Sequence, residues 1–100
     1  MYYAICYDIE NDKLREKTAK ALARHGCKRV QRSVFIAPAI SARQLERLRD
    51  DLKQLLACRL TARDSLLFLP LRSEKGTDIY VLGNNNINTF FEDKPLKIII

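Results

Sequence analysis

The stretch YAICYDIEND, residues 3–12, decides how the fold begins, because an apolar strand runs here into polar residues that can start a helix. Tyrosine and isoleucine favour extended backbone, so we predict a strand over residues 2–9. Successive side chains of a strand point to opposite faces, which places Tyr7 on one face and Asp8, with Cys6, on the other. A carboxylate at the end of an apolar strand is the feature that needs a reason.

Two helices are predicted from their caps and their apolar periodicity. Asn11 or Asp12 can cap the first helix, and Gly26 can end it in the left-handed conformation. Ser41 and Gln44 form a capping box that opens the second. The apolar stripes repeat at helical spacing. They consist of Leu14, Thr18, Ala21, Leu22 and His25 in the first helix and of Leu45, Leu48, Leu52, Leu55 and Leu56 in the second.

Further extended runs are predicted at 29–37, 64–71, 78–83 and 96–100. The polar pair Arg32–Ser33 can kink the first of these runs into two short strands. This order of elements predicts an α+β fold, a two-layer sandwich with both helices on one face of a sheet. Residues 1–83 would form the domain, and residues 84–100 a C-terminal tail whose terminal strand, 96–100, docks onto a partner or the other subunit.

The face of the sheet opposite the helices is also apolar. In the run 64–71, Leu66 and Phe68 point to one face, whereas Leu67 and Leu69 point to the other. An antiparallel sheet that meets water on one side alternates apolar and polar residues, and this one does not. We therefore expect the second face to meet another copy of the chain in a twofold homodimer, with the two sheets facing each other.

Asp8 lies on that second face, so a twofold axis would bring two copies of it close together. Like charges in a desolvated setting repel each other, and a divalent cation would relieve the repulsion. Magnesium commonly takes one or two protein carboxylates and keeps several waters. The alternative is that Asp8 only ends its strand and starts the turn DIEND. The residues alone leave both interpretations open.

The positive charge of the chain is concentrated in one segment. The formal net charge is +6 and the pI is near 9.5. Between residues 13 and 32, Glu16 alone opposes Lys13, Arg15, Lys17, Lys20, Arg24, Lys28, Arg29 and Arg32. Such a density suits a polyanion such as nucleic acid, although a solvated helix face would have the same composition.

The chain has the character of a cytoplasmic protein. It shows no apolar run long enough to span a membrane and no signal peptide, so no membrane partner is expected. Its cysteines, Cys6, Cys27 and Cys58, are odd in number and far apart, and His25 is the only histidine. Reduced thiols are therefore expected, without a structural zinc site.

The segments YDIENDKLREKTAKAL and KRVQRSVF, followed by a helix and then DSLLFLPL, resemble the family of CRISPR-associated protein 2, the small spacer-acquisition subunit of CRISPR systems. The resemblance covers nearly the whole chain. It implies a ferredoxin-like fold of β-α-β-β-α-β type with an extra C-terminal strand, and a homodimer with facing sheets. It also implies that Asp8, the aspartate of the Tyr-Asp-Ile motif, binds Mg²⁺ at the dimer interface.

The same resemblance suggests which residues act. Members are described as metal-dependent endonucleases on RNA or duplex DNA, which would make Asp8 the catalytic residue. Members also act as a non-catalytic DNA-binding hub with the CRISPR integrase, of the CRISPR-associated protein 1 family. Leu14 stands where many members have a second basic residue. The residues expected to bind nucleic acid, four of them from the basic segment 13–32, are Tyr7, Arg15, Lys28, Arg29, Arg32, Ser33 and Phe35.

Two functions therefore stay open. The first is a magnesium-dependent phosphodiesterase, in which Asp8 holds the ion, Arg15 and Arg32 stabilise the substrate phosphate, and Ser33 orients it. The second is a scaffold that holds duplex DNA through its phosphates and docks an integrase, with single-stranded RNA as another candidate ligand. A regulatory dimer for a small ligand is disfavoured, because three glycines and no glycine-rich loop provide no phosphate cradle.

Overall fold

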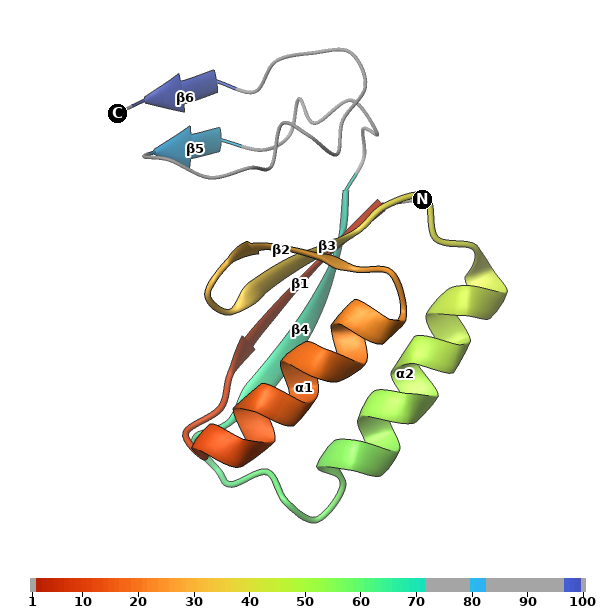
Figure 1. Ribbon diagram of the computed structural model, residues 1–100, viewed down its shortest axis with the longest axis vertical. Coiled ribbons are helices and arrows are strands. Elements are labelled where there is room, and N and C mark those ends of the chain that lie inside the picture. The colour runs from red at the N-terminus through yellow and green to blue at the C-terminus, as the bar shows by residue number, and fades with distance from the viewer. Residues whose placement is uncertain (1, 72–79, 83–96, 100) are drawn as a thin grey trace.

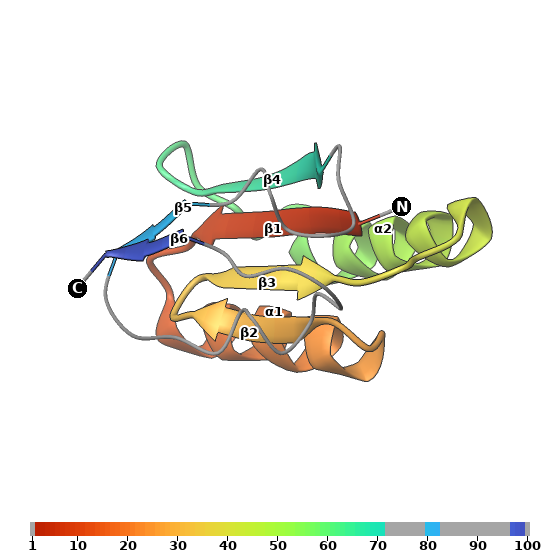
Figure 2. The same ribbon diagram turned by 90° about the horizontal axis from the view of Figure 1, so that it is seen from above.

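A computed structural model of the chain describes residues 2–71, 80–82 and 97–99. The elements follow in the order β1 (Tyr2–Asp8), α1 (Asp12–Arg24), β2 (Lys28–Gln31), β3 (Val34–Ala37), α2 (Ala42–Leu56), β4 (Ser65–Leu71), β5 (Tyr80–Leu82) and β6 (Lys97–Ile99). The first four strands form an antiparallel sheet in the order β2-β3-β1-β4. Both helices cover one face of it, as Figures 1 and 2 show. The predicted α+β class is confirmed.

The helix ends are fixed by the residues that the sequence indicated. The Asn11 side chain caps α1 by accepting a hydrogen bond of 2.8 Å from the Leu14 amide. Gly26, just past the end of α1, has a φ of 83°, the left-handed conformation that glycine adopts without a steric penalty. Ser41 and Gln44 form the predicted capping box of α2. No helix in the described part of the chain is long and apolar enough to cross a lipid bilayer.

The main core lies between the sheet and the helices. Ile5 from β1, Leu22 from α1 and Leu48 from α2 are completely buried there. Thr18 is buried among them. Its hydroxyl donates a hydrogen bond of 2.8 Å to the Leu14 carbonyl, so its polar atom is satisfied. The predicted apolar stripes of both helices face this layer, except that His25 follows the end of α1 and its Nε2 lies 2.6 Å from the Asp51 carboxylate. We call this side of the sheet the covered face.

The opposite side, which we call the open face, is also apolar. Tyr2, Val30 and Ile36 form a second cluster there, against which Ala4, Val34 and Leu71 pack. Leu67 and Leu69 of β4 point to the same side and expose 54% and 46% of their surface. The expectation that both faces are apolar is confirmed, whereas the second copy that would cover the open face remains a prediction.

The predicted division of the run 29–37 into two short strands at Arg32–Ser33 is confirmed. The run is an antiparallel hairpin that reverses direction at Arg32–Ser33, with β2 already starting at Lys28. The pairing register shifts between Arg29 and Gln31, which marks a bulge. The turn is held from outside, because the Tyr7 amide donates to the Ser33 carbonyl at 3.1 Å.

The C-terminal strands pair with each other. β5 and β6 are parallel, with Tyr80 opposite Lys97 and Leu82 opposite Ile99. Within the described residues neither strand joins the four-stranded sheet. The predicted boundary between residues 83 and 84 lies outside the described residues, and so do most of the predicted tail and the outer residues of the runs 78–83 and 96–100.

Candidate nucleic-acid interface

The loop between β1 and α1 is braced by Arg15. Its Nη1 donates hydrogen bonds to the carbonyl oxygens of Ile9 at 3.0 Å and Glu10 at 3.4 Å. Its Nη2 pairs with the Asp12 carboxylate. The guanidinium group therefore has three acceptors of its own chain, and its side chain is only 28% exposed. In this arrangement Arg15 positions the loop that follows Asp8, and its role as a phosphate ligand stays a prediction.

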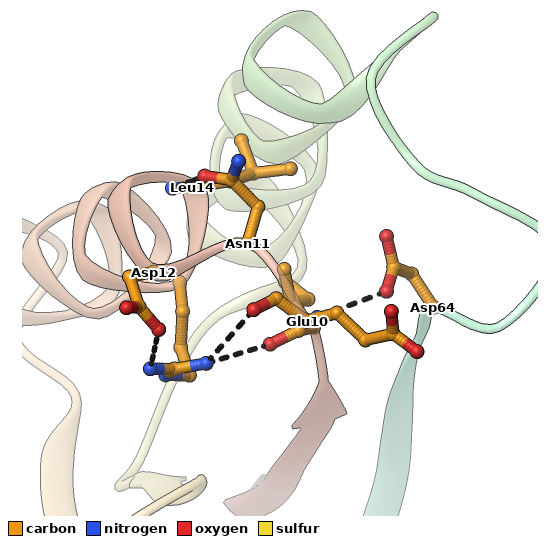
Figure 3. Close-up of polar contacts among 7 residues, drawn as sticks. Glu10, Asn11, Asp12, Leu14 and Asp64 are labelled. Carbon is orange, nitrogen blue, oxygen red and sulfur yellow. Dashed lines mark hydrogen bonds and ion pairs between the residues drawn. The ribbon is translucent and has the colours of Figure 1, made fainter.

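Asp64 holds the same loop from its other side. Its carboxylate accepts hydrogen bonds from the amides of Glu10 at 3.0 Å and Thr61 at 2.9 Å, and Figure 3 shows the first of these. These backbone hydrogen bonds lower the pKa of the Asp64 carboxyl group. The sequence analysis missed Asp64. The available signal was an aspartate just before an apolar strand. Such a carboxylate commonly accepts hydrogen bonds from nearby backbone amides.

Asp8 is the last residue of β1, lies exposed, and stands opposite Ser65 in the register of β4. Within the described residues, no group of three or more histidine, cysteine, aspartate or glutamate side chains lies close enough together to hold a metal ion. One chain therefore offers the single carboxylate of Asp8. That donor set is the minimum that magnesium uses together with waters, and a twofold dimer would add a second carboxylate.

Tyr7 and Phe35 are core residues that shape the hairpin. Their exposed fractions are 5% and 3%, and their rings stack with centroids 6.2 Å apart. The Tyr7 hydroxyl donates to the Arg32 carbonyl at 3.5 Å and accepts from Arg29 Nη2 at 3.4 Å. The Arg29 guanidinium also lies 5.1 Å from the centre of the Phe35 ring, a cation–π contact. The two aromatic residues thus support arginines that are themselves exposed.

A groove between α1 and the β2–β3 hairpin, here called the hairpin groove, collects most of the predicted binding residues. Arg15, Lys28, Arg29, Arg32 and Phe35 all line it. Tyr7 lies behind this lining in the core, and half-buried Ser33 contributes the carbonyl of the turn rather than a wall of the groove.

The positive charge of the hairpin groove comes from the hairpin. The α1 cations that line it are paired, Arg15 with Asp12 and Lys20 with Glu16 at 3.3 Å. In the described part of the chain, Lys28, Arg29 and Arg32 have no carboxylate partner. These three side chains therefore present charge that an anion can neutralise.

Comparison with known proteins gives a family match over most of the chain. The family model described as CRISPR associated protein Cas2 matches residues 1–79. The protein named CRISPR-associated endoribonuclease Cas2 from Aeropyrum pernix is 32% identical over 91 residues, which cover 85% of this chain and 88% of that protein. CRISPR-associated endoribonuclease Cas2 2 from Pyrobaculum aerophilum is 44% identical over 52 residues, and that match spans 49% of this chain and 57% of the relative.

Solved structures share the architecture. A hypothetical protein from Thermus thermophilus superposes with a TM-score of 0.70 at 34% identity, covering 86% of this chain and 94% of that one. Cas2 from Streptococcus pyogenes gives a TM-score of 0.59 at 24% identity, with 71% and 86% covered. At that identity the likeness concerns the fold, a four-stranded antiparallel sheet with two helices on one face.

Proposed function

The chain belongs to the CRISPR-associated protein Cas2 family, and we propose that it is a ferredoxin-like homodimer that binds duplex DNA together with the CRISPR integrase during spacer acquisition. The observation that carries the proposal is the hairpin groove, where Lys28, Arg29 and Arg32 lack carboxylate partners within the described residues. Phosphates are the sequence-independent ligands of such cations, and releasing counterions from DNA supplies much of the affinity.

The hairpin holds the guanidinium group of Arg29 ready for a phosphate. Arg29 is held between the Tyr7 hydroxyl and the Phe35 ring, and Arg32 sits in a turn whose carbonyl accepts from Tyr7. A guanidinium group binds phosphate oxygens through two parallel hydrogen bonds when its orientation is suitable. Because less side-chain freedom is lost on binding, this support favours affinity.

The open face supports the homodimer. Leu67 and Leu69 are exposed on this face, next to the cluster of Tyr2, Val30 and Ile36, which is already buried within the single chain. Contiguous apolar patches on a soluble protein mark an interaction site, and a twofold pair of identical chains is the commonest way to cover one. Such a dimer would carry two hairpin grooves, so one duplex could engage both and gain from bivalent binding.

The second candidate function is a magnesium-dependent endonuclease acting on single-stranded RNA or duplex DNA. The observation that favours it is the name of the relatives, which are called endoribonucleases. Asp8 from each subunit would hold the ion, which when bound polarises a phosphoryl oxygen and lowers the pKa of a water molecule. Arg15 would keep the adjoining loop in place through the carbonyls of Ile9 and Glu10.

Two double variants test DNA binding at the hairpin groove. Lys28→Gln with Arg32→Gln removes two unpaired cations from the groove, and Arg43→Gln with Arg47→Gln removes two exposed cations from α2 as a control. In titrations of labelled duplex DNA at several salt concentrations, the slope of log K against log salt should fall by about 0.9 per lost phosphate contact in the groove variant. Equal slopes in the groove variant and the control would place the DNA elsewhere.

Cleavage assays decide between the two candidates. We would incubate single-stranded RNA and duplex DNA with wild type and with Asp8→Ala, in magnesium and in chelator, and record binding in every reaction. The scaffold predicts binding without cleavage in all of them. Cleavage that requires both magnesium and Asp8, while the variant still binds, would establish the endonuclease.

A further inference from the structure

A groove with an apolar lining lies between α2 and β4, and we call it the α2 groove. Leu66 and Phe68 line it from β4, and Leu60 lines it from the connection between the two elements. Charged residues of α2 form its other wall. We propose that the α2 groove docks an amphipathic helix of the integrase, which rests on the proposed function and names the surface that this partner uses.

The α2 groove lies apart from the two surfaces already assigned. In the four-stranded sheet β2 and β4 are at opposite edges, so the α2 groove and the hairpin groove are at opposite edges as well. The helices lie behind the sheet in Figure 2, on the side away from the open face. A chain that is paired through its open face and holds DNA at its hairpin groove therefore still presents the α2 groove to a third component.

The apolar part of the α2 groove can receive large side chains. Its volume is about 660 Å³, which lies within the usual range of binding pockets. Leu60 exposes 39% of its surface, and Leu66 and Phe68 are half-buried. The Arg49 guanidinium lies 5.3 Å from the centre of the Phe68 ring, a cation–π contact that fixes the ring. A pre-formed pocket with a fixed aromatic side chain suits the apolar anchor residues of a protein partner.

The charges of the α2 groove are balanced, unlike those of the hairpin groove. It contains two carboxylates, Glu46 and Asp50, and two cations, Arg49 and Lys53. Within the part of the chain that the structure describes, none of these four side chains forms an ion pair. A balanced lining attracts a polyanion less than the unpaired cations of the hairpin groove do. The α2 groove therefore fits a protein better than a nucleic acid.

The order of these charges favours a helix as the occupant. Positions 46, 49, 50 and 53 follow helical spacing, so their side chains share one side of α2, and their signs alternate along it. Where two helices pair side by side, charges that flank an apolar seam form ion pairs between the helices and set the choice and orientation of the partner. With its 15 residues α2 is about 22 Å long, so a helix of similar length can pair with the whole stripe.

Replacing Leu60 tests the apolar part of the groove. Leu60→Glu places a carboxylate in the groove, whereas Ala62→Glu adds the same charge to the same connection at an exposed residue that does not line it. In calorimetric titrations with the purified integrase of the same CRISPR system, we expect Leu60→Glu to weaken binding about tenfold or more. Ala62→Glu should bind as wild type does, and both variants should keep the circular dichroism and the DNA affinity of one another.

Replacing Lys53 tests whether the occupant is a helix. Lys53→Glu reverses a charge of the groove, and Arg47→Glu makes the same change at an exposed position of α2 that does not line it. We expect Lys53→Glu to bind the integrase more weakly than Arg47→Glu does, with a difference that shrinks as salt screens the ion pairs. Equal affinities of these two variants, at low salt, would overturn a helix paired alongside α2.

The Cys58 thiol provides a direct footprint of the groove. Cys58 is exposed and lines the α2 groove, whereas Cys27 is buried. Saturating integrase should slow the alkylation of Cys58 by iodoacetamide, which mass spectrometry of the modified peptide measures. Alkylation at the same rate with and without bound integrase would overturn the inference, because a helix in the groove would cover the thiol.

The outcomes separate this inference from the proposed function. Integrase that binds wild type and Leu60→Glu with equal affinity would overturn the α2 groove as its docking site, while the integrase would remain the partner. A wild-type chain that does not bind the integrase would overturn both the α2 groove and the integrase part of the proposed function. Binding of duplex DNA at the hairpin groove is decided separately, by the titrations with the Lys28→Gln, Arg32→Gln variant.

Discussion

The two faces of the central sheet are built from similar residues but end in different states. On the covered face, Ile5 of β1 and Leu48 of α2 are completely buried between the sheet and the helices. On the open face, Leu67 and Leu69 remain about half exposed although they belong to the same strand, β4, as Leu66 and Phe68, which pack on the core. Because apolar surface left in water costs about 25 cal/mol per Å², the proposed second copy would gain free energy by covering Leu67 and Leu69 on the open face.

Charges on the open face should have the largest effect. Leu69→Glu and Leu67→Glu would each force an unpaired carboxylate into the interface of both subunits, and an unpaired buried charge costs several kcal/mol. We expect each variant to be a folded monomer in sedimentation experiments at concentrations where wild type is a dimer.

Leu60→Glu is the matched control for these variants. Leu60 is 39% exposed but lies in the connection between α2 and β4, away from the open face. It should leave the dimer intact. A wild-type monomer, or a dimer that tolerates glutamate at position 69, would show that something other than a second copy covers this face.

A cavity on the covered face should have the next largest effect, and it should act on folding. Leu48→Ala removes a completely buried side chain between α2 and the sheet, and such changes cost about 2–5 kcal/mol in the free energy of unfolding. Leu69→Ala, on the open face, should cost about 1 kcal/mol or less in the monomer, because much of its surface stays in water. Urea unfolding at low protein concentration measures both. Equal losses would mean that the open face is as well packed as the covered one.

Much of this arrangement could be predicted from local sequence. The strand ending at Asp8, the cap at Asn11, the reversal at Gly26 and the capping box at Ser41 are all signals contained within a few neighbouring residues. The alternation in β4 also reveals that both faces are apolar, since side chains of a strand alternate by geometry. These features depend on short-range physics, which a single sequence displays directly.

The break at Arg32–Ser33 was visible in the sequence, but the full reversal of the chain there and the contacts of Arg15 with the preceding loop could not be predicted in this way. The turn at Arg32–Ser33 lacks the Asn-Gly or Asp-Gly pair that favours a two-residue hairpin, and it is held by hydrogen bonds from Tyr7, distant in sequence. Arg15 appeared as a free cation, but its guanidinium group binds carbonyls of the preceding loop. Both outcomes depend on tertiary contacts, which charge and periodicity do not reveal.

The last expected effect is confined to alkaline pH, is absent at neutral pH, and concerns the thiols of the two faces. Cys27 lies in the core of the covered face, and burial raises its pKa from 9.0 to about 11. As the pH rises above 9.0, the unfolded chain loses the Cys27 proton before the folded chain does, so stability should fall through this range. The contribution amounts to about 1.4 kcal/mol per pH unit. Cys27→Ala should remove that slope from urea midpoints measured across the range, and an unchanged slope would contradict the assignment.

Cys6, on the open face, has a pKa that is also raised by burial, but it is only half-buried in one chain. Cys6→Ala should therefore change the slope less in the monomer, and more at concentrations where a second copy covers Cys6, which makes the pair of thiols a direct comparison of the two faces.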